Sequence, residues 1–231
     1  ISECLVGSEM CIRDRENIMD TVLKDMNPVL QMLIVMTLFS LIPFVFCCMT
    51  SFLRFVIVFS MLKTAMGTQQ VPPSIVIIGL AMILTFYTMG STFQKMYEMG
   101  SVPYQKNQNI VEAINEGSKP LKEFMMKQTR ESDLAFFVEM SNGKPPKSPD
   151  EITVWQVAPA FIISELKTAF EIGFIIFVPF IVLDLVVANI LLALGMFMLS
   201  PTIISLPFKL LIFIAVDGWA LIVQGLVTSY N

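Results

Sequence analysis

The chain has 231 residues, of which 55% are hydrophobic and 15% charged, with a mean hydropathy of +0.72 and a net charge of −4. Soluble domains carry about 25% charged residues, so this composition indicates a polytopic membrane protein. The sequence contains no histidine, which excludes His-based catalytic triads, His-ligated zinc and His proton relays, and no basic patch suggests nucleic acid.

Residues 1–26 precede the first apolar segment and are predicted to be a leader outside the fold. The first fifteen residues are polar, contain no apolar stretch of the kind found in signal peptides and do not begin with Met. We expect this leader to be partly non-native, and a native signal peptide could have been lost there.

Residues 27–93 are predicted to form a first helical hairpin. Residues 29–53 are apolar over more than the roughly 20 residues that a bilayer-spanning helix needs, and Pro43 is expected to kink this helix. After a short polar break, Pro72-Pro73 is expected to begin a second helix that runs to the end of the hairpin.

Residues 94–156 differ in composition, with eight Lys or Arg and nine Asp or Glu. Apolar residues recur there at helical spacing, so we expect a small, water-facing helical domain. Arg54 and Lys63 flank the first short connection and favour its placement in the cytoplasm. This domain would then lie on the extracytoplasmic, periplasmic side.

Residues 157–231 are predicted to form a second hairpin. Its first helix should run to about Leu199 with a bend near Pro179, and its last helix should begin near Pro207. No strand alternation and no internal repeat is visible. The predicted fold class is therefore an all-α membrane-associated protein of long kinked helical hairpins, with a small extracytoplasmic helical domain.

Ionisable side chains interrupt the apolar second hairpin. A charge at the centre of an apolar span costs about 2.5–3.5 kcal/mol or more if it faces lipid, so these side chains should face protein or water. They mark a pathway or a buried interface, and Arg54 is a possible partner for them. The six residues are Glu165, Lys167, Glu171, Asp184, Lys209 and Asp217.

Two arrangements are open for the first three of these charges. Lys167 and Glu171 are four residues apart on one helix face, so they can form an intrahelical pair while Glu165 lies in water-exposed first turns. In the other arrangement, Glu165 reaches a basic group on a neighbouring subunit, for which Arg54 is a candidate.

Asp184 has no basic residue within one helical turn in the sequence. A hairpin folded about residue 198 places Asp184 opposite residue 212, which is three residues, or roughly 4–5 Å, from Lys209. A pair across the hairpin or between copies is therefore within reach. Asp217 is about 12 Å from Lys209 along the axis and has no obvious partner. Structural pairing and a proton or ion relay are both open for these charges.

The turn of the second hairpin, residues 195–201, is the other candidate site. The chain has 17 Met, and this turn contains Met196, Phe197 and Met198. Methionine is flexible and polarizable, and such residues often do no more than fill a core. If several copies surround an axis, these turns would instead form an apolar, deformable ring that excludes water.

Several motifs occur in collinear order over residues 27–230. They are Leu41-Ile42-Pro43, Met49-Thr50-Ser51-Phe52 with Arg54, Gly67-Thr68-Gln69-Gln70-Val71-Pro72-Pro73, Ser164-Glu165-Leu166-Lys167-Thr168-Ala169-Phe170, Leu194-Gly195-Met196, Pro207-Phe208-Lys209-Leu210 and Asp217-Gly218-Trp219. Together they closely resemble the FliP family, core subunits of the flagellar protein-export gate, whose injectisome counterpart is SctR. Arg54, together with the sequence of residues 120–134, favours the flagellar branch.

The resemblance implies an all-helical subunit of about five copies, in the bacterial inner membrane at the flagellar basal body. It implies FliQ- and FliR-like partners in the gate, FlhB- and FlhA-like export proteins, and unfolded flagellar subunits as the transported substrate. Met196, Phe197 and Met198 would form a pore gasket, in which Phe197 departs from the Met frequent in relatives. Neighbouring subunits would be held together by charged residues, namely Glu165, Lys167, Asp184 and Lys209.

Three functions are therefore considered. The first is a protein-conducting gate, in the flagellum or in the equivalent injectisome. The second is a small-solute or ion transporter that uses the intramembrane charges, and copy number separates it from the first. The third is a purely architectural basal-body subunit, which a gasket mutant distinguishes. No nucleophile–base pair, phosphate-binding glycine loop or metal cluster is visible in the sequence, so we predict no enzymatic activity, cofactor or metal site.

Overall fold

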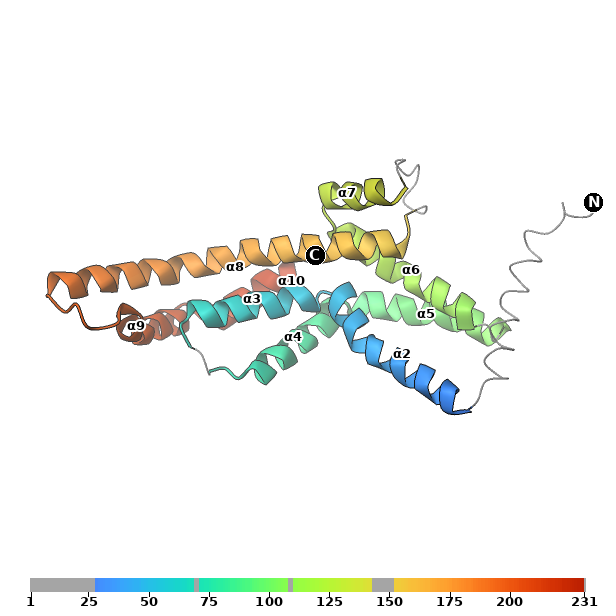
Figure 1. Cartoon of the computed structure of the whole chain (residues 1–231), viewed down its shortest axis with the longest axis horizontal. Helices are drawn as coiled ribbons and strands as arrows, with labels where there is room; N and C mark the ends of the chain where they lie inside the picture. Colours follow the sequence, from blue (N-terminus) through green and yellow to red (C-terminus); the bar gives the residue numbers. More distant parts are fainter. Residues whose placement is uncertain (1–27, 69–70, 108–109, 143–151, 231) are drawn as a thin grey trace, which may run out of the picture. The chain divides into compact units, whose positions relative to one another are not determined.

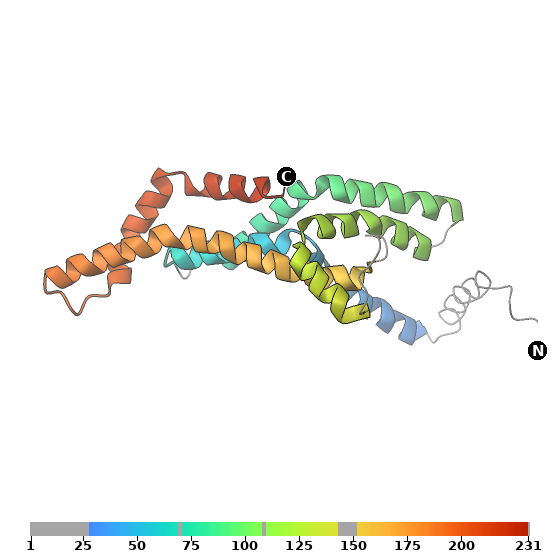
Figure 2. The same ribbon diagram turned by 90° about the horizontal axis from the view of Figure 1, so that it is seen from above.

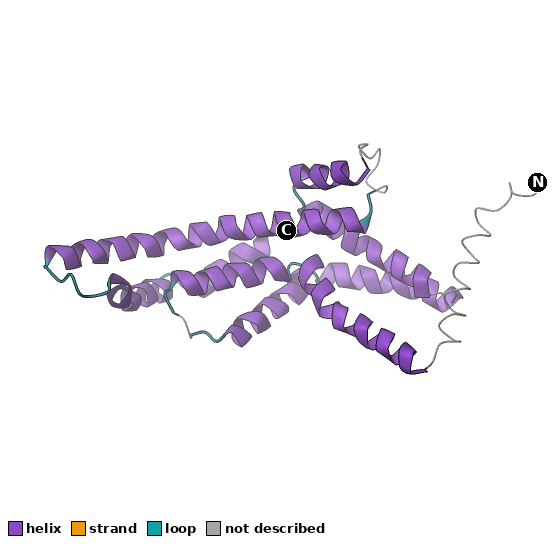
Figure 3. Cartoon of the chain, in the orientation of Figure 1, coloured by secondary structure: helices purple, strands orange, loops and turns teal. Residues whose placement is uncertain are grey.

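The computed structural model describes residues 28–68, 71–107, 110–142 and 152–230 (Figure 1). The predicted leader lies outside these residues. All regular structure in the described ranges is helical and none is strand, which confirms the predicted all-α class (Figure 3). The helices are α2 (Pro28–Met49), α3 (Phe52–Ala65), α4 (Ser74–Thr88), α5 (Gly90–Asn107), α6 (Ile110–Gln128), α7 (Glu131–Asn142), α8 (Val154–Ala193), α9 (Pro201–Ala215) and α10 (Gly218–Thr228).

The chain divides into two compact units, residues 1–45 and residues 46–231. The described part of the first unit is the beginning of α2, whose described side chains are exposed. Helix α2 continues through Pro43, the residue at which the sequence predicts a kink.

The chain turns at Thr50, between α2 and α3. The Thr50 hydroxyl donates to the Phe46 carbonyl at 2.6 Å and accepts from the Phe52 N–H at 3.3 Å. A hydroxyl that takes over backbone partners in this way lets the chain leave the helical path without orphaned polar groups. A threonine, and not a proline, therefore stands at this turn.

The long helix α8 has 40 residues and is continuous through Pro179. It ends at Ala193, earlier than the predicted Leu199. Gly195 adopts a left-handed conformation with φ 75°, and the Met196 N–H donates to the Leu191 carbonyl at 2.9 Å. This is a Schellman cap, which satisfies the last carbonyls and stops the helix.

The next helix, α9, begins at Pro201 rather than near Pro207. Proline fits the first helical turn because its missing N–H would have no partner there. Ser200 precedes it in an extended conformation and ends the turn. The second proline, Pro207, lies inside α9 without interrupting it.

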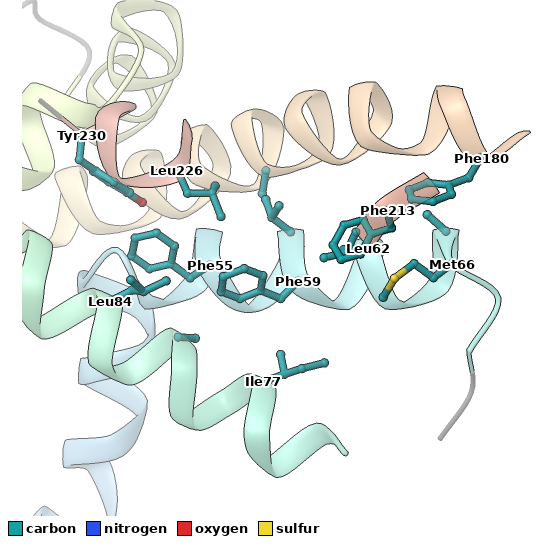
Figure 4. Close-up of a cluster of buried hydrophobic side chains, with 14 residues drawn as sticks. Phe55, Phe59, Leu62, Met66, Ile77, Leu84, Phe180, Phe213, Leu226 and Tyr230 are labelled. Carbon is teal, nitrogen blue, oxygen red and sulfur yellow. The ribbon is translucent and has the colours of Figure 1, made fainter. Parts of the chain in front are cut away.

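The largest apolar core surrounds α3 (Figure 4). Phe55, Val58, Phe59 and Leu62 of α3 are almost fully buried. They pack against residues of α4, α8, α9, α10 and the chain end. These partners are Ile77, Ala81, Leu84, Ala169, Phe180, Phe213, Leu226 and Tyr230.

Helices α5 and α6 lie side by side (Figure 2). Gly100 and Gly117 allow this close approach, since a Cβ at Gly100 would lie 3.2 Å from the Ala113 carbonyl oxygen. A second, smaller core is built around Met125 of α6 and Phe161 of α8. Of the residues expected to form a water-facing domain, helices α6 and α7 thus share a core with α8.

By length and composition, α8 is long and apolar enough to cross a membrane by itself. Three further spans are possible if bent helix pairs are counted as one span each, which gives up to four within the described residues. The pairs α4–α5 and α9–α10 are each bent by 62° at the break.

Candidate functional site

A buried ion pair joins α3 to α8. Arg54 is 3% exposed and Glu165 is fully buried. The Arg54 Nε and Nη2 atoms donate to the two Glu165 carboxylate oxygens at 2.7 and 2.5 Å, which makes the contact bidentate. Two charges removed from solvent require this quality of geometry to offset their desolvation. Of the two arrangements left open by the sequence, the one with Glu165 in water-exposed first turns does not hold. Glu165 does pair with Arg54, but within the same chain rather than with a neighbouring subunit.

Tyr230, which sequence reasoning missed, completes this site from the far end of the chain. Its hydroxyl donates to a Glu165 carboxylate oxygen at 2.6 Å, and its ring centroid lies 3.9 Å from the Arg54 guanidinium carbon. Ser229 accepts from Arg54 at 2.9 Å. Burial, together with the Glu165 charge, raises the pKa of Tyr230 well above its usual range, so the phenol remains a donor. The sequence signal for this contact is an aromatic residue with a hydroxyl group directly after an apolar helix.

A second polar cluster joins α7 to α8. Lys167 pairs with Asp133, and Arg130 pairs with Glu171 at 2.7 Å. The intrahelical Lys167–Glu171 pair is therefore not formed, because each residue finds a partner at the start of α7, Asp133 within the helix and Arg130 just before it. Ser164 also donates to Asp133 at 2.9 Å.

Asp133 is held as a carboxylate by its surroundings. The hydrogen bond from Lys167 lowers the pKa of Asp133, and the hydrogen bond from Ser164 acts in the same direction. Lys167 is 48% exposed and both partners of the Arg130–Glu171 pair are exposed, so solvent weakens these two pairs. This cluster positions α7 more than it adds stability.

A third ion pair crosses the second hairpin. Lys209 Nζ lies 2.7 Å from an Asp184 carboxylate oxygen, and Ser205 donates to the other oxygen at 2.5 Å. Lys209 also donates to the Ala65 carbonyl at 3.2 Å. Because that carbonyl ends α3, the ammonium ties the hairpin to the C-terminus of another helix, where a positive charge is favourable.

The predicted gasket residues lie at the exposed tip of this hairpin. Met196 is 48% exposed, Phe197 76% and Met198 fully exposed. They follow the helix cap at Gly195, so the turn has a defined start. An uncharged turn whose Met and Phe side chains are this exposed is costly for an isolated chain in water and suits a contact surface.

Asp217 stands apart from these pairs. It is exposed at the corner between α9 and α10, in a left-handed conformation with φ 51° and ψ 49°. None of the described residues forms a hydrogen bond or ion pair with its carboxylate. The corner joins two apolar helices, with Ile214 and Val216 exposed beside it.

These features define an all-α protein with a helix long and apolar enough to span a membrane. Its helices are braced internally by ion pairs, and its hairpin presents an apolar tip. A sequence model described as "FliP family" matches residues 35–226. The chain belongs to the FliP family.

Relatives named flagellar biosynthetic protein FliP support this membership. The protein of Bacillus subtilis is 45% identical over 218 residues, which cover 94% of this chain and 95% of the relative. That of Caulobacter vibrioides is 47% identical over 204 residues, covering 88% and 77%. The protein of Buchnera aphidicola from Acyrthosiphon pisum is 47% identical over 202 residues, covering 87% and 53%, so this chain spans about half of that relative.

Proposed function

We propose that this chain is a pore-forming subunit of the flagellar protein-export gate, through which unfolded flagellar subunits cross the bacterial inner membrane. About five copies would surround one axis, together with FliQ- and FliR-like subunits, and would work with FlhB- and FlhA-like proteins. The helical segment between α4 and α8 would face the periplasm. Membership of a family whose members are named flagellar biosynthetic proteins supports the flagellar over the injectisome setting.

The single observation that carries the proposal is the exposure of the turn at Met196, Phe197 and Met198. A monomer gains nothing by holding a fully exposed Met beside an exposed Phe. Around a shared axis, however, several such turns bury one another and exclude water from a narrow opening. Because these side chains carry no charge, an unfolded polypeptide could push them aside without breaking ion pairs.

The buried charged side chains support this proposal because they are already paired within the chain. Arg54 with Glu165 and Asp184 with Lys209 are paired inside the chain, at contacts that leave little exposed charge. A transporter that relays ions would need such groups along a water-filled path. The pairs instead stiffen the helices that present the turn.

The test replaces Met196, Phe197 and Met198 together with Ala in cells that assemble the complex. We expect the complex to keep its size and abundance while the membrane becomes permeable to ions and small solutes, measured as loss of membrane potential. Leu185→Ala is the matched control, since Leu185 is an exposed apolar residue of the same hairpin outside the turn.

An intact complex without increased permeability would remove the gasket role. If export also continued normally in that variant, the chain would be an architectural subunit rather than part of the closure. Loss of the complex in the Leu185→Ala control as well would show that the hairpin surface, not the turn, sets the outcome.

A further inference from the structure

Lys63 on α3 and Asp217 between α9 and α10 are opposite charges, and neither forms a hydrogen bond or ion pair with a described residue. Lys63 is half-buried and Asp217 is exposed. Every other charged side chain of the second hairpin is paired within the chain. Lone charges on surfaces this apolar require either water or a counter-charge from another chain.

The corner that carries Asp217 has a fixed shape. A Cβ on Gly218 would lie 2.3 Å from the Phe213 ring, so only glycine permits this close turn. The Phe213 and Trp219 rings meet edge to face, with centroids 5.5 Å apart. The carboxylate therefore projects from a rigid corner flanked by exposed apolar residues.

Lys63 lines a cavity of about 490 Å³ between α3 and α4. Its lining mixes apolar and polar side chains, among them Val56, Ser60, Thr64, Ser74 and Ile77. An apolar corner with one carboxylate matches such a cavity in both polarity and charge.

The elements that carry the two groups pack on different sides of α3. In Figure 4, Ile77 of the cavity lies on one side of α3, whereas Phe213 and Leu226 of the α9–α10 pair lie on the other. Within one chain, no hydrogen bond or ion pair joins Asp217 to Lys63. A neighbouring copy can bring the corner to the cavity.

The two groups also lie at similar levels along α3. The Trp219 ring, two residues after Asp217, lies 6.4 Å from the Phe59 ring, measured between centroids. Phe59 precedes Lys63 by four residues, which is about 6 Å of helix. When copies are arranged around an axis parallel to α3, equivalent residues lie at the same height along that axis. The α9–α10 corner of one copy can then meet the α3–α4 cavity of the next.

We propose that the α9–α10 corner of one copy enters the α3–α4 cavity of the next, where Asp217 pairs with that copy's Lys63. Because the two surfaces differ, the contact is head-to-tail, and repeating it arranges several copies around one axis. This inference rests on the multi-copy arrangement of the proposed function and adds the residues that join neighbours.

The first test uses the whole assembled complex, with all four cysteines of the chain replaced by Ser and with Lys63→Cys and Asp217→Cys introduced. A short bismaleimide linker is suitable, since an ion pair holds Cα atoms farther apart than a disulfide allows. We expect a ladder of linked copies from the double variant and single copies from each single variant. The control pair, Lys63→Cys with Leu185→Cys, should give no ladder.

A complex of unchanged size without a ladder would overturn the Lys63–Asp217 contact and leave the pore proposal standing. A complex that contains one copy of the chain, measured by native mass spectrometry, would overturn both. The two failures are therefore distinguishable.

A second test removes the charges while keeping the corner. Asp217→Asn is suitable because Asn tolerates the left-handed conformation. We expect Asp217→Asn and Lys63→Gln each to reduce the yield of assembled complex several-fold, and the double variant to lose no more than either single variant, because neither charge is then stranded. Glu139→Gln, on the exposed surface of α7, is the control. Losses that multiply in the double variant would contradict the pair.

Discussion

The hydroxyl of Tyr230 donates to Glu165 at 2.6 Å, although 65 residues separate them in the chain. The same ring lies against the Arg54 guanidinium. The end of the chain is thereby fastened to α3 and α8 at the point where their buried charges meet. This contact makes Tyr230 part of the core.

Replacing Tyr230 with Phe should destabilise the chain by about 1–3 kcal/mol, because a buried Glu165 oxygen loses one of its donors while the packing is kept. Thermal unfolding of the detergent-solubilised complex measures the effect. Tyr97→Phe is the matched control, since Tyr97 is 77% exposed and should change nothing. Equal unfolding temperatures for the two variants would show that the hydroxyl contributes no stability.

Arg54→Lys should reduce stability markedly, even though the charge is kept. Lysine cannot reproduce the two parallel bonds to Glu165, and a buried carboxylate left poorly paired costs about 1–3 kcal/mol. Arg130→Lys changes the exposed pair with Glu171 and should cost less than about 1 kcal/mol. Resistance to limited proteolysis, compared between the two variants, measures the difference, and similar digestion rates would count against a buried bidentate pair.

Charge reversal at Lys209 should lower the amount of assembled complex, because Asp184 would then face another carboxylate. Reversing Asp184 to Lys as well should restore part of the loss. Full recovery is not expected, since a carboxylate at position 209 cannot donate to the Ala65 carbonyl. Blue native electrophoresis measures the assembled fraction, and a double reversal no better than either single change would refute the pair.

Asp133 should make the contact between α7 and α8 sensitive to acid. Its pKa in the folded chain is lowered from the ordinary value near 3.8, chiefly by the hydrogen bond from Lys167. A lowered folded pKa gives stabilisation that is present above the unfolded pKa and is lost as pH falls through the folded pKa. Asp133→Asn should therefore weaken the fold at neutral pH and flatten the decline of unfolding temperature below about pH 4. If the unfolding temperature of Asp133→Asn falls with pH as steeply as that of the original chain, other carboxylates cause the decline.

The sequence was most informative where two partners lie in adjacent helices. Counting residues back from the hairpin turn placed Asp184 near Lys209, and the structure has these two residues in contact. The reasoning works because a short turn fixes the register of antiparallel helices. It was less accurate for the turn itself, since the glycine cap at Gly195 ends α8 before Leu199.

Contacts between distant segments could not be derived in this way. Arg54 and Glu165 are 111 residues apart, and Asp133 is 34 residues from Lys167. Spacing along a single helix allowed the Lys167–Glu171 pair, but Lys167 and Glu171 instead pair with Asp133 and Arg130, at the start of α7. Periodicity describes one helix at a time and carries no information about which helices meet.

The central claim is that the turns at Met196, Phe197 and Met198 from several copies close a common pore. Imaging the purified complex, with its copies counted, tests this most directly. The account predicts about five copies whose turns converge on the central axis and fill it with Met and Phe side chains. Turns that point outward from the assembly, or a complex with one copy of the chain, would contradict it.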